Sequence, residues 1–217
     1  MIYHTTRACI LSTAPYGERG KRIILLSPDR GLLAVHAQGV ILARSKLGGN
    51  LTPYRSLVVT LVSKVQERVI GVEVVQTYHR LWADARRQGY AAWGNEWLMK
   101  ILKEGAADER IFRACETYYE VLNAEEEGSD AIAQLSSYRL AFASMIIEAL
   151  GYRLDVEERK EGQGERRGEV TMRKEMIARA RYYKAKRAAV FEAVERWTRQ
   201  MGVETMKTSK FLTAAMK

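Results

Sequence analysis

Residues 22–39 read RIILLSPDRGLLAVHAQG, two short apolar runs on either side of a turn. The runs, 22–27 and 31–39, are rich in Ile, Leu and Val, and Pro28, Asp29 and Gly31 mark the turn between them. Apolar runs of this length bounded by turn residues are typical of β-strands. We therefore predict that this stretch forms two successive strands.

Similar runs lie before and after this stretch, at about 7–14, 56–63 and 68–75. Together they predict five short strands, the number that an OB-fold barrel needs. The long connection at 40–54 reads ARSKLGGNLTPY from its fourth residue onward. Loops of this kind border the nucleic-acid face in that fold, so this connection is a candidate binding element.

The apolar period becomes helical from about Tyr78 onward, as the spacing of Tyr90, Trp93 and Trp97 shows. Strands followed by helices without alternation indicate two units in series and argue against a doubly wound sheet. We therefore predict an α+β protein. Its five-stranded OB-fold domain occupies residues 1–76 and its helical domain occupies residues 77–217.

Two segments of the helical domain have distinctive compositions. Residues 155–170, DVEERKEGQGERRGEV, are charged and rich in Gly, which predicts an exposed loop or linker. Residues 170–201 carry an apolar stripe at three-four spacing, which predicts one long carboxy-terminal helix. Arg187 interrupts that stripe, either as an arginine that extends to solvent or pairs with a carboxylate, or as a DNA contact.

Charge is distributed unevenly along the chain. The formal net charge of +9 divides into +6 over residues 1–76, −5 over 77–169 and +8 over 170–217. Two basic segments thus flank an acidic one. This pattern favours a polyanionic partner that meets both ends of the chain and not its middle.

Cysteine usage and hydropathy bear on the compartment. Cys9 and Cys115 are the only cysteines and form no C-x-x-C pair, which argues against a disulfide framework and a cysteine zinc site. The first twenty residues lack the continuous apolar stretch of a signal peptide, and the longest apolar stretches, such as 57–62, are only as long as a strand. We expect a cytoplasmic protein.

Catalytic chemistry has little support in the sequence. His4, His36 and His79 are scattered, and none has the spacing of a metal or nucleophile site. The acidic runs 125–127 and 155–158 are typical of solvated surface charge rather than of metal ligands. The sequence therefore predicts a binding protein without an active site, a metal or another cofactor.

Basic residues beside aromatic ones mark the barrel as a DNA-binding candidate. Cations supply contacts to phosphates and exposed rings supply stacking surfaces for bases, the two features that single strands offer. Tyr16 accompanies the first basic group, while the Gly-rich sequence at 46–50 is more typical of a flexible turn than of a phosphate cradle. The alternative is a solvated basic rim. The candidate residues are Arg19, Lys21, Arg22, Arg44, Lys46, Tyr54 and Arg55.

The carboxy-terminal segment is a second DNA-binding candidate. Its cations surround an apolar stripe that must pack on the helical domain, so we expect Arg181 and Lys186 to project into solvent. There they would act together with the barrel and add affinity without sequence preference. The alternative is that Arg179 and its neighbours neutralise the acidic middle segment within the fold.

A partner-binding candidate lies in the helical domain. The aromatic residues Trp93 and Trp97, together with Lys100 and Lys103, suit a peptide tail that ends in acidic and aromatic residues. The alternative is that these tryptophans belong to the core, as large aromatics at helical spacing usually do.

Several short motifs resemble those of one family in order and spacing. They are TRACIL at 6–11, YGE at 16–18, IILLS at 23–27, GLLAVHAQG at 31–39, RSKLGG at 44–49, LTPY at 51–54, ALGYRLD at 149–155 and KTSKFL at 207–212. In this order they resemble RecO, a bacterial mediator of recombinational DNA repair. The resemblance covers most of the chain and is strongest over 5–62.

The resemblance implies an architecture and a set of partners that composition alone does not give. It implies an OB-fold followed by a helical domain, binding of single- and double-stranded DNA, strand annealing and help in loading the recombinase. It also implies partnership with RecR and with the acidic tail of single-strand-binding protein, in the cytoplasm and associated with the nucleoid.

Three departures from the family pattern limit what carries over. Residues 38–42 read QGVIL where many members have a basic run, so the phosphate contacts expected there are missing. The zinc-binding cysteines of some members are absent, and the aspartate usual after Y-G-E is replaced around Gly20. An interaction scaffold with weak DNA affinity is therefore the alternative function, and a nuclease is disfavoured by the lack of a metal cluster.

Overall fold

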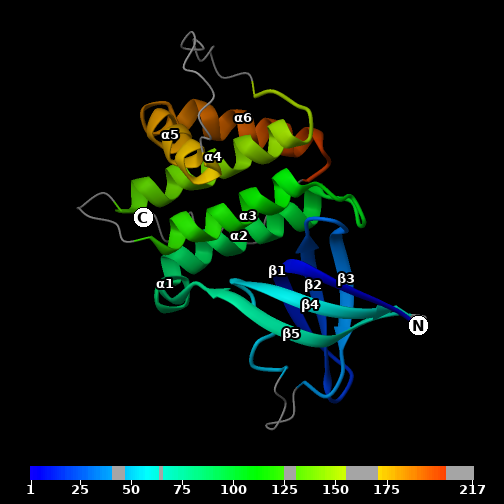
Figure 1. Ribbon diagram of the computed structural model, residues 1–217. Helices are drawn as coiled ribbons and strands as arrows, with labels where there is room; N and C mark the ends of the chain where they lie inside the picture. The colour runs from blue at the N-terminus through cyan, green and yellow to red at the C-terminus, as the bar shows by residue number, and fades with distance from the viewer. Residues whose placement is uncertain (41–46, 64–65, 125–130, 155–170, 204–217) are drawn as a thin grey trace.

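The computed structural model describes residues 1–40, 47–63, 66–124, 131–154 and 171–203. Five strands come first, and six helices follow (Figure 1). The strands are β1 (Ile2–Tyr16), β2 (Gly20–Ser27), β3 (Gly31–Ala37), β4 (Arg55–Ser63) and β5 (Glu67–Thr77). All five predicted strands are therefore present, although β1 begins earlier and β3 ends earlier than the apolar runs do.

The strands close into a barrel in the order β1-β2-β3-β5-β4. All neighbouring strands are antiparallel except β3 and β5, which meet in parallel at His36 and Arg68. Alternate side chains of each strand fill the interior, among them Ile10, Ile23 and Val35. The barrel and the helices behind it confirm the predicted fold class.

The helices are α1 (His79–Ala83), α2 (Ala85–Ile101), α3 (Glu109–Asn123), α4 (Ala131–Ala149), α5 (Met172–Ala185) and α6 (Arg187–Gln200). Asp84 and Asp108 cap α2 and α3, because each side chain accepts a hydrogen bond from the backbone N–H two residues later. In Figure 1, α2 and α3 lie next to the barrel, and α4, α5 and α6 form the end of the molecule away from it.

The long helix predicted over 170–201 is instead two helices. Lys186 leaves helical geometry, with φ −110° and ψ 21°, and thus separates α5 from α6. The division allows both Ala180 and Val190 to be buried against the other helices. The apolar stripe therefore predicted the buried face correctly but not the break beside Arg187.

The barrel and the helices share one core. Residues on the outer face of the barrel, Cys9, Leu11, Leu26 and Leu32, belong to the same buried cluster as the helical side chains. The register between β1 and β2 shifts between Ile10 and Ser12, and the free carbonyl of Leu11 accepts a hydrogen bond of 3.0 Å from the buried amide of Asn95. The bulge therefore turns β1 from the barrel core toward α2.

A second joint lies at the start of β3. Gly31 has φ +66°, and a Cβ atom built on it would lie 2.2 Å from the carbonyl oxygen of Ala106. Beside it, the N–H of Gly105 donates to the carbonyl oxygen of Leu32 at 2.9 Å. The loop between α2 and α3 thus packs directly on the barrel, at a point where only glycine fits.

Candidate nucleic-acid interface

The end of the barrel away from the helices carries an aromatic pair. The rings of Tyr16 on β1 and His36 on β3 lie 4.2 Å apart at 42°. The strand register places Arg22 on β2 directly opposite His36, which in turn lies opposite Arg68 on β5. Two rings and two cations from four strands therefore share this outer face.

Gly20 shapes this face from the middle strand. A Cβ atom there would lie 2.7 Å from the carbonyl oxygen of Tyr16 and 3.1 Å from that of Ala37. Both obstacles are backbone atoms and cannot give way easily, so a side chain at this position forces the strands to shift. The carboxylate that the family pattern has near this position therefore does not fit at Gly20.

The cations around the pair are available to a ligand. Arg19 and Arg22 are exposed and Lys21 is half-buried, and no carboxylate forms an ion pair with them within the residues that the structure describes. Arg68 donates from Nη1 to Oε1 of Gln38 at 3.1 Å. A hollow of about 190 Å³ is lined by Tyr16, Arg19, His36 and Arg68, together with Glu18. This set of residues, Tyr16, Arg19, Lys21, Arg22, His36 and Arg68, is called the distal face below.

The other barrel candidates lie elsewhere. Arg44 and Lys46 fall outside the described residues. Arg55 donates from Nη1 to the carbonyl oxygen of Gly49 at 2.9 Å and to Oδ1 of Asn50 at 3.0 Å, so it ties down the end of the long connection. It pairs with Thr77 beside α1 and not with the distal face.

Tyr54 turns toward the helices. Its ring makes edge contacts with Trp82 at 5.8 Å and Tyr119 at 6.0 Å, and its backbone has φ 62°. Burial raises the pKa of the Tyr54 hydroxyl. The ring is therefore a packing element at the junction with the helices rather than an open stacking surface.

The two tryptophans of the partner-binding candidate are core residues. Trp93 and Trp97 are 3% and 0% exposed, and their rings stack 5.4 Å apart. The guanidinium of Arg139 packs over the Trp93 ring at 5.3 Å. Lys100 and Lys103 are exposed nearby, and Lys100 pairs with Glu96. The structure therefore supports the alternative in which the tryptophans belong to the core. Of the four candidate residues, only the two lysines lie at the surface.

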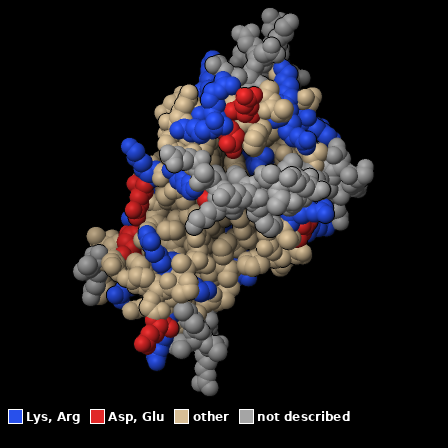
Figure 2. Space-filling model, turned by 180° about the vertical axis from the view of Figure 1, so that it is seen from behind, with Lys and Arg blue, Asp and Glu red and all other residues tan. Residues whose placement is uncertain are grey.

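The carboxy-terminal cations divide into two groups. Arg179 is held by Glu148 and Glu175, with N···O distances of 2.7 and 2.5 Å, so it neutralises acidic residues within the fold. Arg181 is exposed, and the ammonium of Lys186 lies 5.3 Å from the centre of the Tyr182 ring. On the face shown in Figure 2, basic side chains gather over the helical end of the molecule.

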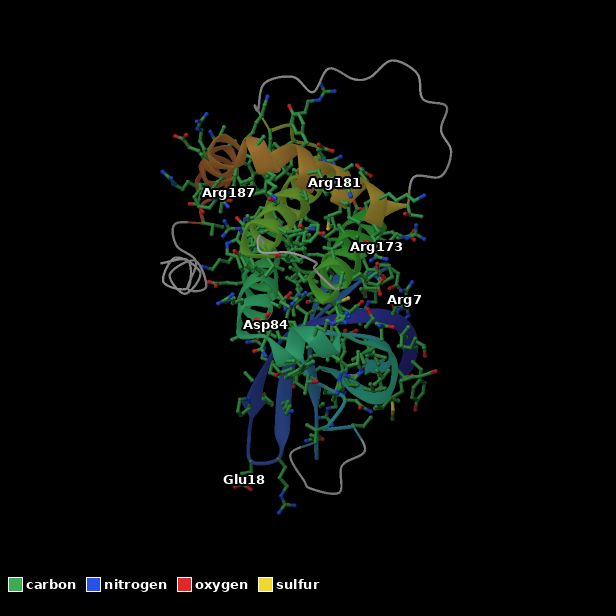
Figure 3. All side chains as sticks on the ribbon, turned by 90° about the vertical axis from the view of Figure 1, so that its left-hand side faces the viewer. Arg7, Glu18, Asp84, Arg173, Arg181 and Arg187 are labelled. Atoms are coloured by element: carbon green, nitrogen blue, oxygen red, sulfur yellow. The ribbon has the colours of Figure 1, made fainter. Side chains whose placement is uncertain are left out.

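The predicted DNA-binding residues of the two basic segments do not gather on one compact face. Figure 3 shows Glu18, in the turn of the distal face, at one end of the molecule, and Arg181 near the other. Arg7 and Arg173, which sequence patterns did not single out, lie between these ends on the side of α5. Contacts at both ends would therefore need a ligand that extends along the molecule, or two ligands.

Two features of other protein classes are absent from the described part of the chain. No three His, Cys, Asp or Glu side chains gather there as metal ligands. Among the same residues, no helix has the length and apolar character required to cross a membrane.

Comparison with known proteins bears on the family. Residues 1–78 match the family model described as "Recombination protein O N terminal". Relatives named DNA repair protein RecO include that of Geobacter sulfurreducens, 28% identical over 151 residues, which are 69% of this chain and 59% of the relative. That of Cellvibrio japonicus is 30% identical over 149 residues, 68% of this chain and 59% of the relative.

A further relative has a higher identity over a shorter stretch. DNA repair protein RecO of Synechococcus elongatus is 34% identical over 110 residues, 50% of this chain and 41% of the relative. The chain spans about three fifths of the length of the relatives from Geobacter species. The resemblance found in the sequence motifs is confirmed: residues 1–78 match the RecO amino-terminal family model, and the chain is similar to DNA repair protein RecO of several bacteria.

Proposed function

We propose that this protein acts in recombinational DNA repair as a binding protein that holds single-stranded DNA on the distal face. The observation that carries the proposal is the Tyr16–His36 pair, with ring centres 4.2 Å apart, beside Arg22 and Arg68 on neighbouring strands. The names of the relatives support a role in DNA repair.

The chemistry of the distal face suits an unpaired strand. Aromatic rings stack on bases of any sequence, and guanidinium and ammonium groups contact the phosphates between them. The position also suits it, because OB-folds bind oligonucleotides on the face of their second and third strands and on the loop between the first two. Tyr16, Arg22 and His36 occupy that region here.

Replacing Tyr16 with alanine should weaken binding of an oligothymidylate roughly tenfold, since stacking on one base contributes about 1–3 kcal/mol. The Tyr16 ring is exposed and contributes little to the stability of the folded state, so the thermal midpoint of unfolding should hardly change.

Replacing Arg22 with alanine should instead flatten the dependence of log Kd on log salt concentration by about 0.7, the value for one phosphate contact. Fluorescence anisotropy at several salt concentrations measures both effects.

Arg113 offers a matched control, because it is an exposed arginine on α3 that pairs with Glu109 at 3.1 Å. Its replacement by alanine should leave affinity and salt slope unchanged. Affinity that survives both Tyr16→Ala and Arg22→Ala would remove the distal face from the site. Binding that is weak and insensitive to salt in the unaltered protein would favour the interaction scaffold, for which the missing basic run at 38–42 is the supporting observation.

The wider role belongs to the same proposal. Strand annealing, loading of the recombinase, binding of double-stranded DNA and contact with RecR are what the similarity to RecO implies for a binding protein without an active site or cofactor. Arg181 and Lys186 would supply a second group of DNA contacts, and Lys100 and Lys103 would attract the acidic tail of single-strand-binding protein. Such a protein would act in the bacterial cytoplasm, on the nucleoid.

A further inference from the structure

A hollow of about 770 Å³ lies where the outer face of the barrel meets the helical domain, well away from the distal face. Residues of β1, β5, α1, α3 and α5 line it. The groups that donate hydrogen bonds along its wall are mostly cations or amides: Arg7, Gln76, Arg80, Asn123 and Arg173. Figure 3 shows Arg7 and Arg173 close to each other on the same side of the molecule.

Arg7 is held in place by Glu116 but keeps hydrogen-bond donors that are not used. Its Nη2 atom donates to both carboxylate oxygens of Glu116 at 2.8 Å, and the hydroxyl of Ser56 donates to one of them at 2.7 Å. No other nitrogen of this guanidinium makes a hydrogen bond within the described residues, and the side chain is 51% exposed. Glu116 thus holds Arg7 in place while Nη1 and Nε remain available to a ligand.

Arg173 is a further cation of the hollow. It is exposed in the first turn of α5 and makes no ion pair or hydrogen bond within the part of the chain that the structure describes. Thr171 at the start of α5 gives no side-chain cap, so the positive end of the helix dipole adds to the potential there. Asn123 accepts the backbone N–H of Arg80 through Oδ1, which leaves its amide nitrogen as a donor.

Glu120 opposes these cations. It lines the same hollow, and its burial raises its pKa, with the charge of Arg173 acting in the other direction. Glu116 and Arg7 form an ion pair, so their charges largely offset each other, and the charge of Glu116 also raises the pKa of Glu120. In the empty hollow, Glu120 is therefore the group that competes with an anionic ligand for Arg173.

We propose that this hollow binds the backbone phosphates of a second nucleic-acid strand, through Arg7, Arg173 and the amide donors between them. A phosphate diester needs charged and neutral donors and no apolar anchor. An acidic peptide would normally also bury apolar side chains, and the hollow offers only Val75, Ala124 and the largely buried ring of Tyr78 for this. The charge and polarity of the lining therefore favour nucleic acid.

The proposal rests on the proposed function in assigning the ligand to nucleic acid, but it concerns a separate surface. With one strand on the distal face and another in the hollow, a single molecule holds two strands at separate sites, on a barrel and a helical domain that share one core. Arg181 continues the line of cations from Arg7 and Arg173 along α5 in Figure 3. This arrangement gives strand annealing a physical basis, because the complementary strands are brought together without sharing a site.

Two substitutions in the hollow should have opposite effects. Arg173→Ala should weaken the second of two binding events, seen on titration with a labelled oligothymidylate, by about tenfold or more. Glu120→Gln removes the competing charge and should strengthen that event about two- to fivefold. Lys174→Ala is the matched control, since it removes one charge at the next position from a side chain that does not line the hollow.

The distal-face variant Tyr16→Ala with Arg22→Ala separates the two proposals. In that background one binding event should remain, and adding Arg173→Ala should abolish it. If both events survive the distal-face substitutions but Arg173→Ala removes one, the distal face is wrong and the hollow stands. If Arg173→Ala has no more effect than Lys174→Ala, or if Arg173→Ala weakens binding of polyglutamate but not of the oligonucleotide, the hollow is not a nucleic-acid site.

Discussion

Replacing Trp97 with alanine should lower the free energy of unfolding by about 3–5 kcal/mol, the usual effect of removing a large aromatic side chain from a core. Its ring is fully buried and contacts those of Trp93, Phe142 and Trp197, with centres 5.4, 6.3 and 5.9 Å away. Its indole nitrogen also donates to the hydroxyl of Thr198 at 3.0 Å. This one residue therefore joins α2, α4 and α6.

Urea unfolding followed by circular dichroism measures the effect. Trp82 is the control, because it is 42% exposed and its replacement by alanine should cost about 1 kcal/mol or less. Trp97→Phe should fall between them, since it keeps most of the packing but leaves the hydroxyl of Thr198 without that donor. A Trp97→Ala protein of unchanged stability that no longer bound an acidic tail peptide would contradict the core assignment and restore the partner site.

Gly31→Ala should destabilise the protein by roughly 2–5 kcal/mol. Part of the effect is the left-handed backbone at φ +66°, and part is the position of the new Cβ atom, 2.2 Å from the carbonyl oxygen of Ala106. Because that obstacle is backbone, the loop between α2 and α3 must move away from the barrel. The hydrogen bond from Gly105 to Leu32 is then lost as well.

Gly105→Ala is the matched control for the same joint. Gly105 has φ +79°, but nothing lies within 4 Å of a Cβ atom built on it, so only the backbone strain of about 1 kcal/mol should appear. The difference between the two variants in thermal or urea unfolding therefore isolates the steric contact. Equal effects would mean that the loop is not pressed against β3 as the structure has it.

Most of the fold could be predicted from the sequence because each element carries a local signal. The alternation of Leu33, Val35 and Ala37 shows which side of β3 is buried, and the helical spacing of Tyr90 and Trp93 shows a buried helix face. The break at Lys186 could not be predicted in this way. It depends on how α5 and α6 both reach the same core, which is a property of the tertiary packing.

The candidate site was harder to predict for the same reason. Arg19 and Arg22 stand out as basic residues near a turn, but His36 becomes part of a face only through its pairing with Arg22 and its contact with Tyr16. The alternation of side chains along β3 indicates that His36 points outward from the barrel, and this signal could have identified it as a surface residue. The Tyr54 ring points toward α3, and this direction could not be predicted from the sequence. A tyrosine in a loop gives no local signal that distinguishes a buried ring from an exposed one.

The shared core also limits how much of the barrel a DNA strand can cover. Along the outer faces of β2 and β3, Leu26 and Leu32 are packed against the helices, whereas Arg22 is exposed and His36 is half-buried. A strand that entered at the β1–β2 turn would therefore meet the helical domain partway along the face. We expect an occluded site toward the short end of the range of about 4–16 nucleotides that an OB-fold covers, so that many copies can line up densely on one filament of DNA.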